Sequence, residues 1–193
     1  MHRAHLLPVV DLVETNGDDA LRARNGGAVS EDYNYNIRPL REQDARHILS
    51  WRYQQPYHFY NPPTGSNHDY YVEQFLNPEL NFHAIVDRAD NLVGFCSFGV
   101  DGQVPGGDYT EDALDIGLGM KPELTGQGQG KAFFQAILAH TNTLADAEPR
   151  VRLTVATFNQ RAMRLYRHFG FQEVERFLDT LAGVDYTVMV REA

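Results

Sequence analysis

Alternation of apolar and polar residues is the clearest pattern in the middle of the chain. Between positions 82 and 98 apolar side chains recur at every second residue on both sides of Asp90 and Asn91, which supply turn chemistry. This pattern predicts a β-hairpin. The remaining predicted strands, recognised by alternation or β-branched content, lie at 35–38, 115–120, 151–157, 171–177 and 184–192.

Helical periodicity accounts for the segments between these strands. Residues 41–55 and 131–141 place apolar side chains three and four positions apart, so that only one face of each helix can be buried. Residues 160–169 repeat this pattern and follow Asn159, a natural N-cap. A further helix is predicted over residues 68–76. The resulting order is β, α, α, β, β, β, α, β, α, β, β, which is typical of a mixed α/β domain.

The first part of the chain lacks both patterns. An apolar stretch near the start is interrupted by Pro8 and Asp11, and no small-residue cleavage site follows it, so no secretory signal is predicted. The stretch after it mixes charged, glycine and small polar residues, as flexible segments do. We therefore interpret residues 1–34 as a flexible N-terminal extension and 35–193 as a single domain. A cap over the domain or a homodimer contact is the alternative role for the extension.

Composition narrows the classes of partner. The chain has 193 residues, of which 42% are hydrophobic, enough for one domain with a real core. Seventeen basic and twenty-six acidic residues give a formal charge of −9, which disfavours nucleic acid and anionic membranes and suits a cationic substrate. The single cysteine, Cys96, excludes an internal disulfide and is expected to be a buried apolar side chain. We expect a cytoplasmic protein.

Two kinds of site are not predicted. No apolar run approaches the roughly 18 residues that a membrane span needs. The eight histidines show no HExxH spacing, and there is no CxxC, so no metal site is expected.

Glycines gather where the strand at 115–120 leads into a helix. Gly126, Gly128 and Gly130 directly precede the helical pattern, and glycines at a helix start let main-chain N–H groups approach an anion, most often a phosphate. A nucleotide P-loop fits badly, because Thr125 stands where its first glycine belongs and Ala132 follows Lys131. The G-x-G-x-G spacing also departs from the dinucleotide fingerprint.

A third kind of phosphate loop fits better. TGQGQG followed by a helix resembles motif A of the GCN5-related N-acetyltransferase (GNAT) family, whose pattern is [QR]-x-x-G-x-[GA]. The run FNQRAMRLYRHFGF resembles the second signature of that family, N-x-x-A-x-x-x-Y-x-x-x-G-F. The matching residues of that signature are Asn159, Ala162, Tyr166, Gly170 and Phe171. One departure is Thr125, which stands where the family usually has Gln or Arg.

The resemblance implies a fold and a cofactor. The fold is a central mixed sheet of about seven strands, flanked by helices, in which the fourth and fifth strands splay apart and admit acetyl-CoA. Main-chain groups of Leu118, Gly119 and Met120 would pair with the pantetheine arm, and Asn159 would reach the cofactor from the other side of the splay. The pyrophosphate would be held by the loop residues Gly126, Gln127, Gly128, Gln129, Gly130 and Lys131.

The resemblance also implies catalytic residues. Tyr166 would protonate the departing thiolate, although its place on the buried stripe of its helix equally allows a core role. Asp115 is the best-placed carboxylate for a general base, because Thr154 stands where some family members carry Glu; a surface role for Asp115 or a water relay is the alternative. The region that includes Tyr57, Tyr60 and Asn61 would line the acceptor site, and a packed rim of tyrosines is the other reading.

Together these features predict an acetyl-CoA-dependent N-acetyltransferase. It would move an acetyl group by direct attack to a primary amine, either of a small molecule or of a protein or peptide. The alternative is a non-catalytic acyl-CoA-binding module, a sensor or an assembly part, on the same fold.

Overall fold

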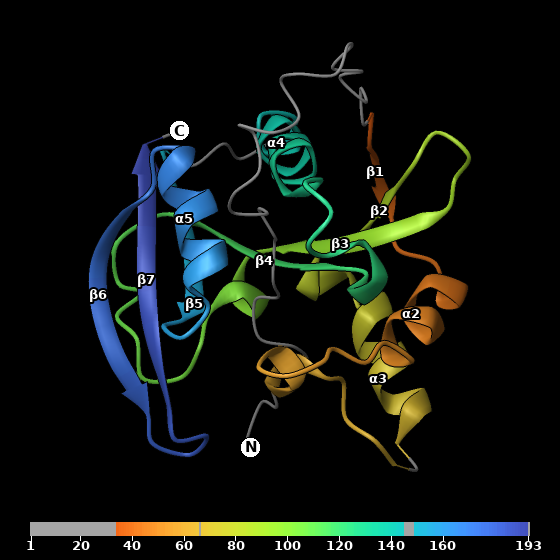
Figure 1. Cartoon of the computed structure of the whole chain (residues 1–193), viewed down its shortest axis with the longest axis horizontal. Coiled ribbons are helices and arrows are strands. Elements are labelled where there is room, and N and C mark those ends of the chain that lie inside the picture. Colours follow the sequence, from red (N-terminus) through yellow and green to blue (C-terminus); the bar gives the residue numbers. More distant parts are fainter. Residues whose placement is uncertain (1–33, 66, 145–148, 193) are drawn as a thin grey trace, which may run out of the picture.

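Seven strands form one mixed sheet in the order β1-β2-β3-β4-β5-β7-β6 (Figure 1). The computed structural model describes residues 34–65, 67–144 and 149–192, and the predicted N-terminal extension lies outside this part of the chain, apart from its last residue. The strands are β1 (Asn36–Pro39), β2 (Phe82–Val86), β3 (Leu92–Phe98), β4 (Leu114–Met120), β5 (Arg150–Ala156), β6 (Gln172–Asp179) and β7 (Val184–Glu192).

Within the described residues, four α-helices and four short 3-10 helices connect the strands. The α-helices are α2 (Glu42–Leu49), α3 (His68–Leu76), α4 (Gly130–Thr141) and α5 (Gln160–His168). The 3-10 helices are η1 (Tyr57–Tyr60), η2 (Pro78–Leu80), η3 (Val100–Gly102) and η4 (Pro122–Leu124). None of the helices in the described ranges is long and apolar enough to span a membrane.

The sheet separates two hydrophobic cores. One core joins the sheet to α4 and α5 and contains Ile116, Leu118 and Met120 of β4. The other joins the opposite face to α2 and α3 and contains Phe95 of β3. Figure 1 shows α4 on one side of the central strands and α2 and α3 on the other. We call these two surfaces the α4/α5 face and the α2/α3 face of the sheet.

Glycines on the α2/α3 face of β4 let side chains of β3 lie across it. Phe95 pairs with Gly119 and Ser97 pairs with Gly117 in the antiparallel register of β3 and β4. A Cβ atom on Gly119 would lie 2.3 Å from the ring of Phe95, and one on Gly117 would lie 2.3 Å from Ser97 Oγ. Only glycine permits this close approach. The alternation of apolar residue and glycine in β4 therefore reflects packing as well as strand geometry.

The sheet opens between β4 and β5. These strands run parallel, and they pair only through Leu114 with Val151 and Asp115 with Arg152. Beyond this point β4 remains paired with β3 as far as Met120, and β5 remains paired with β7 as far as Ala156. The predicted seven-stranded mixed sheet, splayed between its fourth and fifth strands, is confirmed.

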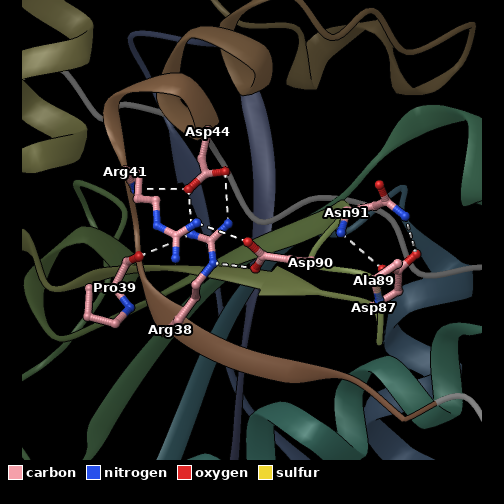
Figure 2. Close-up of polar contacts among 8 residues, drawn as sticks. All are labelled: Arg38, Pro39, Arg41, Asp44, Asp87, Ala89, Asp90 and Asn91. Carbon is pink, nitrogen blue, oxygen red and sulfur yellow. Dashed lines mark hydrogen bonds and ion pairs between the residues drawn. The ribbon is translucent and has the colours of Figure 1, made fainter.

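A cluster of ion pairs joins β1, α2 and the β2–β3 turn (Figure 2). Arg38 Nη1 lies 2.6 Å from Asp44 Oδ2, and both side chains are largely buried. Asp90 in the turn accepts from Arg38 Nε and Arg41 Nη1, each at 2.9 Å. Asp44 also accepts from the main-chain N–H of Arg41 at 2.9 Å, which caps α2. These contacts fix the start of α2 against the hairpin.

The first helix is shorter than its pattern predicts. It was expected over 41–55, but α2 ends at Leu49. Trp51 and Tyr53 are buried whereas Arg52 and Gln54 are exposed, which is the period of an extended segment. The segment after α2 therefore runs as a loop with alternate side chains directed into the protein.

Candidate active site

Main-chain groups of β4 face the opening between β4 and β5. Gly99 N donates to Asp115 O at 2.8 Å and Lys121 N donates to Val93 O at 2.9 Å, so the odd-numbered residues of this strand direct their main-chain groups toward β3. Because this direction alternates along a strand, Leu118 and Met120 direct theirs toward β5. Pairing with β5 stops before these residues. An extended ligand could therefore hydrogen-bond to Leu118 and Met120 as an additional strand would.

The glycine loop lies at the open end of the splay, between η4 and α4. Gly126 and Gly128 have φ angles of 79° and 78°, in the left-handed region that favours glycine. A Cβ atom on Gly128 would meet no protein atom within 4 Å, so its backbone borders open space. The next residues lead into the first turn of α4, whose N–H groups and dipole attract anions.

Side chains of the loop fasten it to the protein. Gln127 Nε2 donates to Glu123 O at 2.6 Å, and Gln129 Oε1 accepts from the hydroxyl of Tyr35 at 2.8 Å. Thr125, which replaces the usual Gln or Arg, donates through Oγ1 to Pro122 O at 2.8 Å. These three side chains shape the loop, which leaves main-chain groups as its means of holding an anion.

A pocket of about 310 Å³ lies beside this loop and brings together three segments that are distant in sequence. The segments are the loop after α2, the residues around η4, and the first turn of α5. The lining residues are Arg52, Tyr53, Gln54, Gln55, Pro56, Tyr57, Pro122, Thr125 and Arg161. Two guanidinium groups and no carboxylate line the pocket, so it favours an anionic ligand or an anionic part of one.

Tyr53 was not singled out by its sequence context, yet it closes one wall of the pocket. Its buried hydroxyl donates to Met120 O at 2.8 Å. Asn61 holds the main chain of Tyr53, because its Oδ1 accepts from Tyr53 N at 2.5 Å and its Nδ2 donates to Tyr53 O at 3.4 Å. Asn61, expected to contact the acceptor, thus positions Tyr53. No local pattern of the sequence announces the contact of Tyr53 with Met120, which lies 67 residues away.

The two other tyrosines expected at the acceptor site occupy different positions. Tyr60 is fully buried, its hydroxyl accepts from Asn159 Nδ2 at 3.2 Å, and its ring packs against Phe158. Tyr57 lines the pocket and lies under the Arg161 guanidinium, 4.7 Å from the ring centroid. Asn159 also caps α5, since its Oδ1 accepts from Ala162 N at 3.1 Å. The structure therefore brings Tyr57 to the pocket and places Tyr60 behind it.

Tyr166 lies in the core of the α4/α5 face. It is fully buried and belongs to the cluster that contains Leu118 and Met120. Its ring centroid is 5.0 Å from that of Phe134 and 6.1 Å from that of Phe171. The Tyr166 side chain therefore packs on the same face of the sheet as the side chains of Leu118 and Met120.

Asp115 forms a buried ion pair at the closed end of the splay. Its Oδ1 accepts from Arg152 Nε at 2.7 Å, and its Oδ2 accepts from Arg152 Nη2 at 2.8 Å and from Gln103 Nε2 at 2.7 Å. The side chains of Asp115 and Arg152 are 3% and 5% exposed. Both carboxylate oxygens are therefore occupied by donors that tie β4 to β5 and to the segment after η3.

Two further expectations concern Cys96 and a metal site. Burial raises the pKa of the Cys96 thiol far above its ordinary value, as befits an apolar core residue rather than a nucleophile. Among the described residues no three of His, Cys, Asp and Glu gather in a way that could hold a metal ion. Thr154, which stands where some acetyltransferases carry Glu, makes a 3.0 Å hydroxyl contact with Tyr109.

Comparison with known proteins decides the family. The model of the acetyltransferase (GNAT) family matches residues 43–171. This chain belongs to the GNAT acetyltransferase family. The match runs from α2 to the end of the second signature, so it includes the splay, the glycine loop and α5. No curated protein matches the sequence significantly.

Solved GNAT structures share the fold. A chimera of spermidine N-acetyltransferase SpeG from Vibrio cholerae and hSSAT superposes with a TM-score of 0.64 at 21% identity, over 82% of this chain and 95% of that chain. A manganese complex of Vibrio cholerae SpeG, a spermidine/spermine N-acetyltransferase, gives 0.58 at 19%, covering 82% and 92%. A dodecameric Vibrio cholerae spermidine N-acetyltransferase gives 0.57 at 20%, covering 82% and 93%.

Proposed function

We propose that this protein is an acetyl-CoA-dependent N-acetyltransferase that moves an acetyl group to a primary amine by direct attack. The observation that carries the proposal is the splay itself. Leu118 and Met120 direct main-chain groups into the gap where β5 has separated, and the glycine loop and α4 begin at its open end. A long ligand with an amide-rich arm and a phosphate group fits this arrangement.

Residues of the loop and of the pocket would hold the cofactor. Main-chain groups of Leu118 to Met120 would bind the pantetheine arm, and those of Gly126 to Lys131 would bind the pyrophosphate. Arg161, on the first turn of α5, adds a positive charge to the same pocket. Asn159 would act from the β5 side, where it already caps α5 and binds Tyr60.

The chemistry requires two proton movements. Acetyl-CoA supplies an activated acyl group as a thioester, and an amine attacks its carbonyl carbon while the thiolate departs. At pH 7 an alkyl amine with a pKa of about 10.4 must lose a proton at a cost of roughly 4.6 kcal/mol. We assign proton donation to the thiolate to Tyr166; the support is its place in the core of the α4/α5 face together with Leu118 and Met120 of β4. Main-chain N–H groups of β4 would polarise the carbonyl.

The acceptor would enter from the opposite face, which carries the loop after α2. Of the three residues expected there, Tyr57 is the one that lines the pocket, and because Arg161 lies over its ring in a pocket that favours an anion, we assign Tyr57 to the cofactor rather than to the amine. Tyr60 and Asn61 would act indirectly by holding Asn159 and Tyr53. The paired state of Asp115 removes the reason to propose it as the base, and we assign it a structural role instead.

A turnover screen tests the proposal. Purified protein and acetyl-CoA are incubated with spermidine, with a lysine-containing peptide and with a peptide that has a free N-terminus, and products are read by mass spectrometry alongside thiol release. We expect one amine class to gain a single acetyl group. Spermidine is included because the solved relatives are spermidine N-acetyltransferases. Acetyl-CoA binding by calorimetry without any product would favour the non-catalytic sensor instead.

A further inference from the structure

We propose that Asp101 is the proton acceptor for the amine, acting through one water on the α2/α3 face of the splay. This inference rests on the proposed transferase function and deepens it by naming the base. Asp101 lies in η3, the turn of 3-10 helix between β3 and β4. It belongs to neither family signature, so the motifs of the sequence give no indication of it.

The backbone of η3 lies directly on β4 at the level where the splay begins. A Cβ atom on Gly102 would lie 2.9 Å from the carbonyl carbon of Ile116 and 3.0 Å from Gly117 N, a contact that only glycine allows. The last pair between β4 and β5 is formed by Asp115, one residue before Ile116. The turn is therefore anchored next to the first residues of β4 that face the gap.

The carboxylate of Asp101 lies over Gly117. Its Oδ2 is 3.5 Å from the position that a Gly117 Cβ would take, and it accepts from Ser97 Oγ at 3.1 Å. Gly117 points to the α2/α3 face, the side that carries the acceptor loop with Tyr53 and Tyr60. Because Gly117 has no side chain, the Asp101 carboxylate can lie close to β4. The next residue of β4, Leu118, directs its main-chain groups into the gap proposed for the cofactor.

The electrostatic surroundings of Asp101 differ from those of Asp115. Burial raises the pKa of Asp101 to about 7, and the hydrogen bond from Ser97 opposes this rise only in part. Within the described residues no basic side chain pairs with it. From β3 the group that faces it is the Ser97 hydroxyl, and from β4 it is the backbone of Gly117. The charged residues of β4 and β5 at the closed end of the splay, Asp115 and Arg152, form an ion pair with each other. A base that titrates near neutral pH is well matched to proton abstraction at neutral pH.

In the proposed step the amine first loses a proton and then attacks the thioester. The ammonium form of the acceptor gives one proton through the water to Asp101, which later releases it to solvent. The amine nitrogen then forms a bond to the carbonyl carbon as the carbon–sulfur bond breaks. Tyr166 gives its proton to the departing thiolate, and the second proton lost by the nitrogen passes through water to the Tyr166 phenolate and restores it. No additional reactant is required.

The test compares Asp101→Asn with wild type on the amine that gives the highest turnover in the screen. We expect kcat/KM to fall about 10²-fold or more and the rise of kcat/KM between pH 6 and 8 to disappear, with the calorimetric Kd for acetyl-CoA within about twofold. Asp101→Glu should recover part of the rate. Ser97→Ala should shift the rise to higher pH, because the charged carboxylate loses a hydrogen bond. Asp69→Asn, an exposed substitution on α3, is the charge-matched control.

The outcomes separate the two proposals. A wild-type protein that acetylates no amine contradicts the transferase function, and the role of Asp101 with it. A wild-type protein that turns over while Asp101→Asn retains its rate and pH profile overturns the Asp101 assignment alone. Should Asp101→Asn fail to fold, the Ser97→Ala profile decides: a shift toward higher pH supports the base, and an unchanged profile contradicts it.

Discussion

At the scale of single residues, local sequence patterns predict main-chain geometry better than they predict side-chain pairs. Leu118, Met120 and Gly128 border the splay or open space as expected, because strand alternation and loop glycines are local properties. Asp115 was chosen for its position in the strand, but its partner Arg152 lies 37 residues away and no local pattern announces the pair. Tyr53 reaches Met120 across 67 residues and was missed for the same reason.

Gly128 provides the first prediction. Gly128→Val places a branched side chain in the open space at the loop and strains a backbone with a φ of 78°. We expect the calorimetric affinity for acetyl-CoA to fall at least tenfold, about 1.4 kcal/mol. Gly183→Val is the matched control, because Gly183 also has a positive φ of 66° and open surroundings but lies in the β6–β7 turn. Equal affinities for the two variants would remove the loop from the site.

Tyr166 provides the second prediction. Tyr166→Phe keeps the ring between Phe134 and Phe171 and removes only the hydroxyl. If that hydroxyl protonates the thiolate, kcat should fall about 10²-fold, the lower end for general acid catalysis, since a thiolate is already a fair leaving group. Stability should change by about 1 kcal/mol or less. Measuring kcat and melting temperature on one preparation separates the roles, and a fully active Phe variant would leave Tyr166 as a core residue only.

At the scale of elements, the splay depends on how its closed end is held. β4 and β5 are paired at two positions only, Leu114 with Val151 and Asp115 with Arg152. At the second position the side chains of Asp115 and Arg152 also form two hydrogen bonds. Gln103, from the segment after η3, adds a third contact to the same carboxylate. The end of the opening is therefore fixed by charge and hydrogen bonding rather than by a long ladder. The strands and helices were predictable from periodicity and the splay from the family resemblance, whereas this clamp required knowing which side chains of β4 and β5 meet.

The clamp leads to the third prediction. Asp115→Asn leaves the Arg152 charge buried without its counter-ion, and breaking such a pair typically costs about 3–5 kcal/mol. We expect a clear loss in the free energy of unfolding, measured by urea denaturation, while the pH profile of kcat/KM keeps the shape seen in wild type. Glu111→Gln is the control, because it breaks the exposed pair with Arg150 at the same end of β5 and should cost less than about 1 kcal/mol. A pH profile altered by Asp115→Asn would restore it as a candidate base.

At the scale of the whole molecule, the two faces of the sheet carry different groups of the proposed site. The α4/α5 face carries α4, which the glycine loop opens, and Tyr166, whereas the α2/α3 face carries Tyr53, Tyr60 and Asp101. The order of elements predicted from the sequence led to this architecture because each amphipathic element has one face to bury. The assignment of residues 1–34 as an extension and the homodimer both stay predictions.

Two histidines make the stability of the whole fold sensitive to acid, which is the fourth prediction. Burial lowers the pKa of His83 and of His140 below the ordinary value of 6.5, and the charge of His83 lowers that of His140 further. Their rings lie 5.1 Å apart. Because the folded pKa values lie below the unfolded one, their contribution to stability is complete above pH 6.5 and is lost as pH falls through the folded values. His140→Gln should therefore lose less stability than wild type between pH 7 and 5 in urea titrations. An identical decline in both proteins would contradict this account.

The central claim is that acetyl-CoA lies in the splay between β4 and β5, and amide chemical-shift mapping on isotope-labelled protein tests it most directly. Acetyl-CoA should perturb the main-chain amides of Leu118 and Met120 together with those of Gly126, Gly128 and Gly130, while amides of the exposed edge strand β6 stay unchanged. Perturbations confined to other surfaces, with the amides of β4 and the glycine loop unmoved, would contradict the claim.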